Sequence, residues 1–259
     1  MAKVLVFANH KGGSGKTTTS VHVAFALGEK GFKVLLVDLD SQAHATLCTG
    51  VLPYKVTRGA FEVFCSFVEK GVVMREVICR NLGFDLLPAN EELSGFETKF
   101  SSFPRREAVV KNFLLELESE YHFILIDTPP SLGLLTLNAM VSGDFLIIPV
   151  KTDFLSLAGL VQMMQTLYRV NAYFNPQLRL LGIVPTMYDG RTRVAREAVR
   201  QLEENFGREK VFVPIRQDVK LAESPSFSQV VFQYAPFSRG ARDYRVLAEE
   251  ILQKVGENE

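Results

Sequence analysis

A glycine-rich segment near the N-terminus contains the side chains best suited to chemistry. Its sequence, residues 10–18, is His-Lys-Gly-Gly-Ser-Gly-Lys-Thr-Thr. An apolar run, residues 4–8, precedes it, and the apolar spacing of a helix follows it as far as Gly28 and Gly31. In a strand–turn–helix of this kind, the glycines let consecutive backbone N–H groups face one anion, and the helix N-terminus adds partial positive charge. The segment therefore predicts a nucleotide phosphate site.

The residue types in this loop have separate expected tasks. Lys16 is placed to lie along the β- and γ-phosphates, and Thr17 is placed to offer its hydroxyl to Mg²⁺. The ordinary phosphate loop begins with glycine where this chain has His10, and it lacks the second lysine, Lys11. The residues expected to bind nucleotide here are Lys11, Gly12, Gly13, Ser14, Gly15, Lys16, Thr17 and Thr18.

Two later apolar runs end in carboxylates. Residues 33–40 end with Asp38 and Asp40, and residues 121–127 end with Asp127. Unbroken apolar runs are typical of strands buried on both faces of a parallel sheet, and ligands collect at the carboxyl ends of such strands. Asp127 is therefore expected to hold Mg²⁺. Asp38 and Asp40 point the same way from their strand, where a carboxylate can hold Mg²⁺ through its water shell or orient an attacking water.

Alternating strand and helix patterns must position these groups. Besides the strands above, apolar runs predict strands at residues 84–89, 144–150 and 180–187, and apolar spacing predicts helices at residues 61–68, 106–118 and 155–170. No linker or repeat interrupts this alternation. The sequence therefore predicts an α/β fold with a doubly wound, mostly parallel sheet and helices on both faces, in one domain over residues 1–259.

Composition limits the general forces on the chain. The 29 lysines and arginines balance the 29 aspartates and glutamates, so any binding to nucleic acid must come from a local patch. Three cysteines, Cys48, Cys65 and Cys79, lack metal-ligand spacing, and the chain shows no signal-peptide pattern. No apolar run is long enough to span a membrane. We expect reduced thiols, a cytoplasmic location and no membrane partner.

A local basic patch does occur late in the chain. Arg193, Arg196 and Arg200 recur at helical spacing and share one helix face, with Arg191 before them and Lys220 after them. A dense group of arginines suits contacts to the phosphate backbone of DNA without base reading. Three glutamates are interspersed on the same helix, so the charges fit a solvated helix face equally well.

These motifs together resemble the ParA/MinD class of P-loop ATPases, and within it the ParA/Soj partition ATPases. The resemblance covers nearly the whole chain and rests on residues 11–17 (a deviant Walker A motif), 38–44, 127–133 (Asp-Thr-Pro-Pro-Ser-Leu-Gly), 186–193, 218–226 and 237–241.

The resemblance implies an ATPase that forms a homodimer around two ATP molecules. It implies that Lys11 reaches the nucleotide of the partner subunit and that Asp40 directs hydrolysis, so Asp40, Lys11 and Lys16 are the expected catalytic residues. Thr17, Asp38 and Asp127 are then the expected Mg²⁺ residues. A loop containing Arg216 and Asp218 corresponds to the family's adenine-binding loop.

The resemblance also implies partners. Its basic residues hold double-stranded DNA without regard to base sequence, and the corresponding residues here are Arg191, Arg193, Arg196, Arg200 and Lys220. In this family a ParB-like protein or a cargo adaptor accelerates weak ATP hydrolysis, and the ATP-bound protein associates with the nucleoid. The cargo is a chromosome, a plasmid or a large protein assembly.

Two loops depart from the family pattern, and two other functions stay open. Ser41-Gln42-Ala43-His44 replaces Pro-Gln-Gly-Asn, and Arg216-Gln217-Asp218 replaces Pro-Arg-Asn. A MinD-like membrane-cycling ATPase would need a basic amphipathic C-terminal helix, whereas residues 243–259 have acidic ends. A metabolic P-loop enzyme would need a substrate pocket in place of the arginine face.

Overall fold

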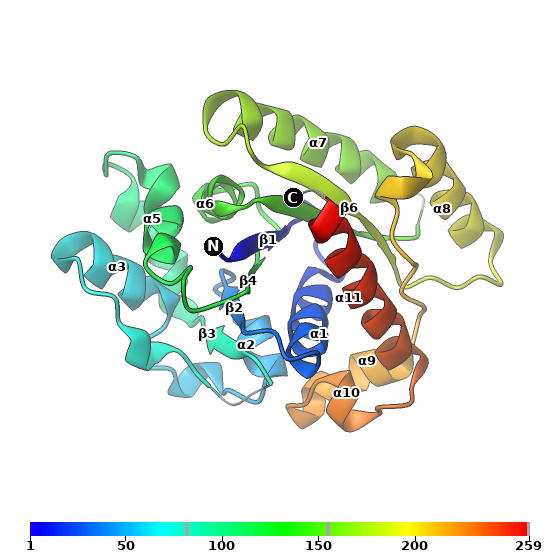
Figure 1. Cartoon of the computed structure of the whole chain (residues 1–259), viewed down its shortest axis with the longest axis horizontal. Helices are drawn as coiled ribbons and strands as arrows, with labels where there is room; N and C mark the ends of the chain where they lie inside the picture. Colours follow the sequence, from blue (N-terminus) through cyan, green and yellow to red (C-terminus); the bar gives the residue numbers. More distant parts are fainter. Residues whose placement is uncertain (81–82, 154–155, 258–259) are drawn as a thin grey trace.

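The computed structural model describes residues 1–80, 83–153 and 156–257. Within those residues the centre of the molecule is a six-stranded sheet in the order β3–β2–β4–β1–β5–β6, with every neighbouring pair parallel (Figure 1). The strands are β1 (Lys3–Phe7), β2 (Val34–Asp38), β3 (Asp85–Leu87), β4 (Phe123–Asp127), β5 (Phe145–Lys151) and β6 (Arg179–Thr186). The predicted parallel α/β fold is confirmed.

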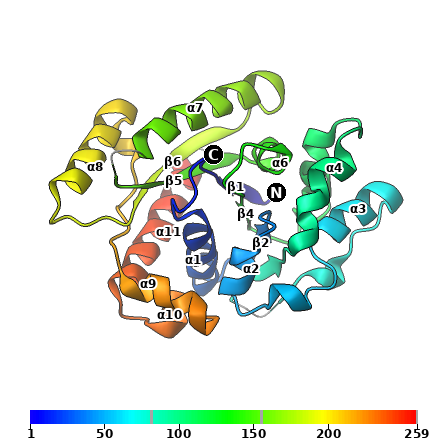
Figure 2. The same ribbon diagram turned by 180° about the vertical axis from the view of Figure 1, so that it is seen from behind.

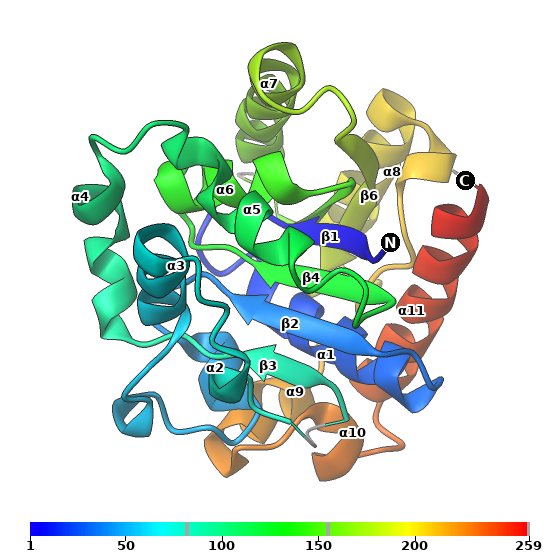
Figure 3. The same ribbon diagram turned by 60° about the vertical axis from the view of Figure 1, so that its left-hand side comes forward.

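Helices cover both faces of this sheet (Figure 3). One apolar layer joins Leu5 and Phe7 of β1 to α1 (Lys16–Glu29), α10 (Val231–Tyr234) and α11 (Arg239–Glu257). The other joins Val4 and Val6, which alternate with them, to α3 (Ala60–Lys70), α4 (Phe96–Phe100), α5 (Val109–Leu115), α6 (Leu134–Ser142) and α7 (Ser156–Tyr173). Leu155, where we expected the helix of residues 155–170 to begin, lies outside the described residues.

Three further helices contribute less to these layers. Ala45 of α2 (His44–Cys48) belongs to the first layer and Leu202 of α8 (Arg193–Phe206) to the second, whereas α9 (Val219–Glu223) has no buried residue. Figures 1 and 2 place α8, α9, α10 and the start of α11 on one side of the molecule, opposite α3. The predicted basic residues of α8 and α9 are therefore on the same side of the fold.

One expected helix, residues 106–118, is interrupted. It begins as a 3₁₀ turn at Arg106–Ala108 and continues as the shorter α5. In an unbroken helix the Val110 N–H would donate to the Arg106 carbonyl. The buried Asn138 takes both groups instead, since its Oδ1 accepts from Val110 at 3.1 Å and its Nδ2 donates to Arg106 at 2.9 Å. This contact between distant segments explains why the first turn of the expected helix is separate from α5.

A buried histidine joins α1 to the C-terminal helices. The Nε2 atom of His22 accepts from the Val231 N–H at 3.0 Å, and its ring stacks on Tyr244 with centroids 4.9 Å apart. Because Nε2 accepts, Nδ1 must carry the ring proton, which it donates to the Thr18 carbonyl at 2.6 Å. Burial lowers the pKa of His22 to about 4.

The lowered pKa of His22 leads us to predict that the free energy of unfolding decreases in acid. Its folded pKa, about 4, lies below the ordinary value of 6.5, so between these values the unfolded chain binds a proton that the folded chain does not. The contribution is present above pH 6.5 and is lost as pH falls toward 4. We expect the unfolding free energy of the parent to fall by about 2 kcal/mol, relative to a His22→Leu variant, between neutral pH and about pH 4.5.

Urea unfolding at the two pH values measures this difference. The same substitution at His44, which is exposed, is the control and should follow the parent. Parallel pH profiles for the parent and the His22 variant would contradict the prediction.

Candidate nucleotide and magnesium site

Strand register brings the predicted carboxylates beside the phosphate loop. Asp127 at the end of β4 pairs with Phe7 at the end of β1 on one side and with Asp38 at the end of β2 on the other. The loop of residues 10–15 leaves β1 directly after this point. The carboxyl ends of three neighbouring strands therefore meet at one edge, as the sequence predicts.

The loop has the backbone shape that its glycines permit. Gly13 and Gly15 adopt φ of 68° and 87°, in the left-handed region that favours glycine. The Thr186 hydroxyl of β6 donates to the Ser14 carbonyl at 2.8 Å and fixes the loop to the sheet. The Ser14 hydroxyl is buried without a hydrogen-bond partner among the described residues, so it remains available to a ligand.

The end of β4 fits a divalent cation. The Thr17 hydroxyl donates to Asp127 Oδ2 at 2.7 Å, and the buried Asp127 Oδ1 has no partner among the described residues. Burial, with the charge of Asp38, raises the pKa of Asp127 to about 8. An uncompensated buried carboxylate oxygen is unfavourable, and Mg²⁺ prefers oxygen ligands of this kind. These residues fit Mg²⁺.

Nucleotide oxygens would have to complete that coordination. No group of three or more acidic, histidine or cysteine side chains in the described ranges is arranged to hold a metal ion. Mg²⁺ is commonly held by one or two carboxylates together with substrate phosphates and water. Thr17 and Asp127 therefore suit a cation that arrives with a nucleotide.

Asp38 has a second task that the sequence did not suggest. Its Oδ2 accepts from the Thr46 backbone N–H at 2.9 Å and hydroxyl at 2.7 Å, and its Oδ1 accepts from the Asp40 N–H at 3.1 Å. The Thr46 hydroxyl also accepts from the Ala89 N–H. Asp38 thus holds the start of α2 and the turn that carries Asp40, and its contact to the shell of Mg²⁺ stays a prediction.

The turn after β2 holds Asp40 close to the loop lysine. Burial lowers the pKa of Lys16, and the charges of Asp127 and Asp40 oppose that shift, so both carboxylates act on its ammonium group. Ala43 adopts φ 51° where the family pattern has glycine. A left-handed alanine costs about 1 kcal/mol or slightly more. The substituted loop therefore keeps a glycine-type turn at some cost in strain.

The second lysine lies at the mouth of the site. Lys11 Nζ is 3.2 Å from Asp153 Oδ1, and Lys151 Nζ is 3.4 Å from the other oxygen of the same carboxylate. The Lys11 and Asp153 side chains are each about one-third exposed. Lys16, in contrast, is buried and donates to the Lys11 carbonyl at 3.4 Å. The two lysines therefore occupy different places, one inside the loop and one at its rim.

Asn9 and Asp153 support this rim and were missed by the sequence reasoning. The buried Asn9 accepts from the Lys11 N–H at 3.0 Å and donates to the Pro149 carbonyl of β5 at 2.6 Å. Asp153 lies more than 140 positions from the lysine that it contacts. The contacts of Asn9 with Pro149 and of Lys11 with Asp153 join segments far apart in the chain, so only the fold brings them together.

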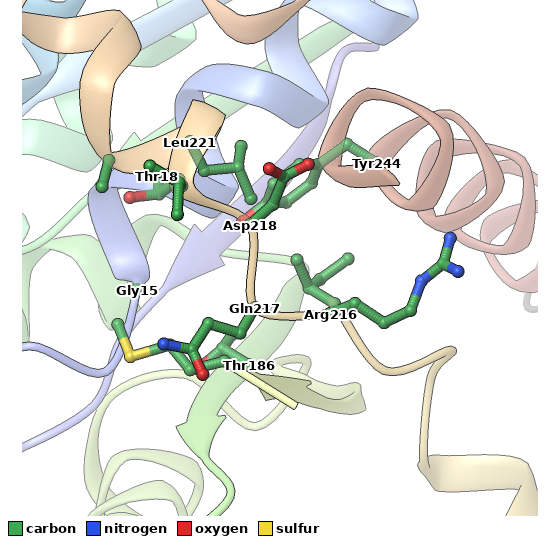
Figure 4. Close-up of a pocket in the computed structure, with 12 residues that line it drawn as sticks. Gly15, Thr18, Thr186, Arg216, Gln217, Asp218, Leu221 and Tyr244 are labelled. Atoms are coloured by element: carbon green, nitrogen blue, oxygen red, sulfur yellow. The ribbon is translucent and has the colours of Figure 1, made fainter. Parts of the chain in front are cut away.

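A cavity of about 300 Å³ adjoins the loop at Gly15 and Thr18 (Figure 4). We call it the base cavity. Its other lining residues are Thr186, Met187, Ile215, Arg216, Gln217, Asp218, Val219, Leu221, Ala222 and Tyr244. A mostly apolar cavity next to a phosphate loop suits the base of a nucleotide.

The two side chains predicted to bind nucleotide here are engaged elsewhere. Figure 4 shows Arg216 extending toward α11, where its guanidinium is 2.7 Å from Asp243. Asp218 accepts from the Lys220 N–H at 3.0 Å and from the Gly240 N–H at 2.8 Å. Their role in nucleotide binding stays a prediction that rests on their backbone, and the sequence reasoning did not select Gln217, which lies between them.

The predicted DNA-binding cations lie on one side but are largely paired. Arg191 binds Asp189 through two hydrogen bonds of 2.8 and 2.9 Å, although its side chain is 90% exposed. The other pairs are Arg200 with Glu197 and Glu204, and Lys220 with Glu223, while Arg196 donates to the Gly190 carbonyl. Exposed ion pairs contribute about 0–1 kcal/mol each, so phosphates can replace these acids.

The helices were compared with the length and apolar character that a membrane span requires. Within residues 1–80, 83–153 and 156–257, none is both long and apolar enough to cross a bilayer.

Comparisons with known proteins agree with this geometry. A family model described as an AAA domain matches residues 2–180. The chromosome-partitioning ATPase Soj of Thermus thermophilus is 40% identical over 255 residues, which cover 98% of this chain and 96% of that protein. The sporulation initiation inhibitor protein Soj of Bacillus subtilis is 36% identical over 252 residues, covering 97% and 98%.

A solved structure is similar over the whole chain. It is cobyrinic acid a,c-diamide synthase from Mycobacterium smegmatis with a bound ATP analog and magnesium, at 34% identity and a TM-score of 0.87. The match covers 100% of this chain and 97% of that one.

The buried Asp127 oxygen that has no hydrogen-bond partner among the described residues leads to a prediction about how Mg²⁺ affects nucleotide binding. An Asp127→Asn variant keeps the size of the side chain and an acceptor for Thr17, but it loses the charge. We expect Mg²⁺ to strengthen binding of a fluorescent ATP analogue about tenfold in the parent, roughly 1.4 kcal/mol, and hardly at all in the variant.

Titrations with Mg²⁺ and with EDTA measure this effect. The control is Asp144→Asn, because Asp144 accepts from the Val4 N–H at the opposite ends of the strands. A full Mg²⁺ response in the Asp127 variant would show that this carboxylate does not hold the cation.

Proposed function

The chain belongs to the ParA/Soj family of partitioning ATPases, and from this membership we propose that it is an ATP-dependent switch that dimerises, binds duplex DNA and positions a cargo. Its nucleotide is ATP with Mg²⁺, in line with relatives named as ATPases and the similar structure solved with an ATP analog and magnesium. The observation that carries the proposal is the position of Lys11. Asp153 holds its side chain at the rim of the site, whereas the Lys16 side chain lies within the loop and donates to the Lys11 carbonyl.

Within one subunit the loop binds and orients the nucleotide. The backbone of residues 12–17 and Lys16 hold the phosphates, and the base lies in the base cavity. Thr17 and Asp127 hold Mg²⁺, which neutralises charge on the β- and γ-phosphates when bound. Asp40 accepts a hydrogen bond from the attacking water and orients it toward the γ-phosphate. The products are ADP and phosphate.

Lys11 acts in catalysis only when a second subunit is present, because it contacts the nucleotide of that subunit. An ammonium group at the rim can exchange Asp153 for the phosphates of a nucleotide bound by a partner, because both ions are exposed enough for the exchange to be inexpensive. A Cβ on Gly12 would make only an ordinary contact, at 3.9 Å, with the Pro130 side chain, so packing within one subunit does not require glycine there. We attribute the glycine to the close approach of the second subunit. ATP then selects the closed dimer over the monomer.

The side of the molecule that carries α8 and α9 binds DNA. In the closed dimer two copies of Arg191, Arg193, Arg196, Arg200 and Lys220 form one surface, which binds the DNA backbone without base reading. Such a protein is cytoplasmic and associates with the nucleoid in its ATP state. Hydrolysis reopens the dimer, and a ParB-like or cargo-adaptor protein accelerates this step.

A membrane-cycling function is disfavoured by α11. Its apolar residues Leu247, Ile251 and Val255 are buried against the sheet and α1, so they are already used in the core. A helix that binds a bilayer would have to present that stripe to lipid.

A metabolic function is the second candidate, and the similar synthase structure favours it. In that case ATP would activate a small molecule for ligation, and the basic surface would be incidental. An Arg191 variant would then keep the full activity of the parent.

The proposal predicts DNA binding that depends on nucleotide and on Arg191. We expect the protein to bind random-sequence duplex DNA with ATP but not with ADP, and an Asp40→Ala variant to stay bound for longer. An Arg191→Glu variant should bind at least about tenfold more weakly, because it replaces a phosphate contact with a repulsion. Fluorescence anisotropy at several salt concentrations measures this.

Arg75→Glu is the matched control, since Arg75 is also exposed and ion-paired, with Glu120, away from α8 and α9. Equal DNA binding with ADP and ATP, or no binding with either, would contradict the proposal.

A further inference from the structure

A second cavity, of about 450 Å³, shares a wall with the base cavity. We call it the arginine cavity. It is lined by Tyr188, Asp189, Gly190, Arg191, Arg216, Gln217, Val219 and Arg239. Arg216, Gln217 and Val219 line both cavities, so one short segment separates the nucleotide base from the arginine cavity.

Three arginine residues from separate elements line this cavity. Arg191 comes from the loop after β6, Arg216 from the segment before α9, and Arg239 from the first position of α11. Asp189 is the acidic side chain in the lining. A cavity with this lining favours an anion.

Of the three arginines that line the cavity, Arg239 is the one without an ion pair among the described residues. Arg191 is bound to Asp189, and Arg216 is bound to Asp243. The Arg239 side chain makes no hydrogen bond or ion pair with any residue that the structure describes, and the residue is exposed. Its guanidinium is therefore free to bind a ligand.

The charge of Arg239 acts on two nearby carboxylates, those of Asp189 and Asp218. Hydrogen bonds from Arg191 lower the pKa of Asp189 to about 2, and the charge of Arg239 adds to that shift. Backbone hydrogen bonds from Gly240 and Lys220 lower the pKa of Asp218 against its desolvation, and Arg239 contributes there too.

Arg239 is the first residue of the 19-residue α11, where the helix dipole places positive charge. Asp218 already accepts from the Gly240 N–H at this helix start. A phosphate bound between Arg239 and Arg191 would add to the negative charge that Asp218 supplies there.

We propose that the arginine cavity binds a phosphate group of duplex DNA, with Arg239 as its main cation and Arg191 as the second. The inference rests on the proposed function and extends the DNA contact from α8 and α9 to the start of α11. Guanidinium groups match phosphate oxygens through paired hydrogen bonds. Arg191 is 90% exposed, and it can turn from Asp189 to the phosphate at little cost.

The test compares Arg239→Ala with Arg242→Ala. Arg242 is exposed on the same helix but does not line the cavity, so it is a matched control. Both variants and the parent are loaded with a non-hydrolysable ATP analogue and Mg²⁺ and titrated with labelled random-sequence duplex at several salt concentrations. We expect Arg239→Ala to bind about tenfold more weakly and to lower the salt slope by about one per arginine removed.

The outcomes separate this inference from the proposed function. A parent that binds no duplex overturns both. A parent that binds, with Arg239→Ala equal to Arg242→Ala, overturns the inference alone. Analogue affinity and melting temperature show that the variants are folded, and Arg239→Gln provides the same comparison should the alanine variant unfold.

A second arm distinguishes DNA from free phosphate. The melting temperature of the analogue-loaded protein is measured in inorganic phosphate and in sodium chloride of equal ionic strength, without DNA. We expect the difference between these salts to be the same in the parent and in Arg239→Ala. Stabilisation by phosphate that requires Arg239, together with unchanged DNA affinity, would assign the cavity to the free anion and overturn the DNA assignment.

Discussion

The buried carboxylate at the end of β4 is the interaction on which the site depends. Asp127 has one oxygen held by Thr17 and the other without a partner among the described residues. Parallel register with β1 and β2 leaves it little freedom to move, because it lies between Phe7 and Asp38 on neighbouring strands. Such a group is unfavourable in the empty protein and favourable beside a cation. Binding of Mg²⁺ and nucleotide therefore also stabilises the fold.

The cations that we propose contact other molecules are each paired with an acidic side chain of their own chain. Lys11 rests on Asp153, Arg191 on Asp189 and Lys220 on Glu223, each at the surface of its own chain. Contacts of this kind are worth little, so a partner's phosphate or a DNA phosphate can replace the acid without a large barrier. Under the proposed function, ATP-dependent dimerisation would determine when these cations change partners.

The parts that could be predicted from the sequence depend on local spacing. The phosphate loop, the carboxylates after buried strands and the parallel sheet all follow from residues that are close in the chain. The missed parts depend on contacts between distant segments. Asn138 interrupts a helix about 30 positions away, and Asp243 binds the guanidinium of Arg216, for which its position suggested a nucleotide contact. Ala43 shows the reverse case, in which the fold imposes a glycine conformation on another residue.

Sedimentation velocity tests the central claim most directly, because it reports dimerisation without requiring DNA or a cargo. The account predicts a species of 29.0 kDa with ADP and twice that mass with a non-hydrolysable ATP analogue and Mg²⁺. It also predicts that a Lys11→Ala variant stays at the smaller mass with either nucleotide. The same mass with ADP and with the analogue, or a Lys11 variant that dimerises like the parent, would contradict the account.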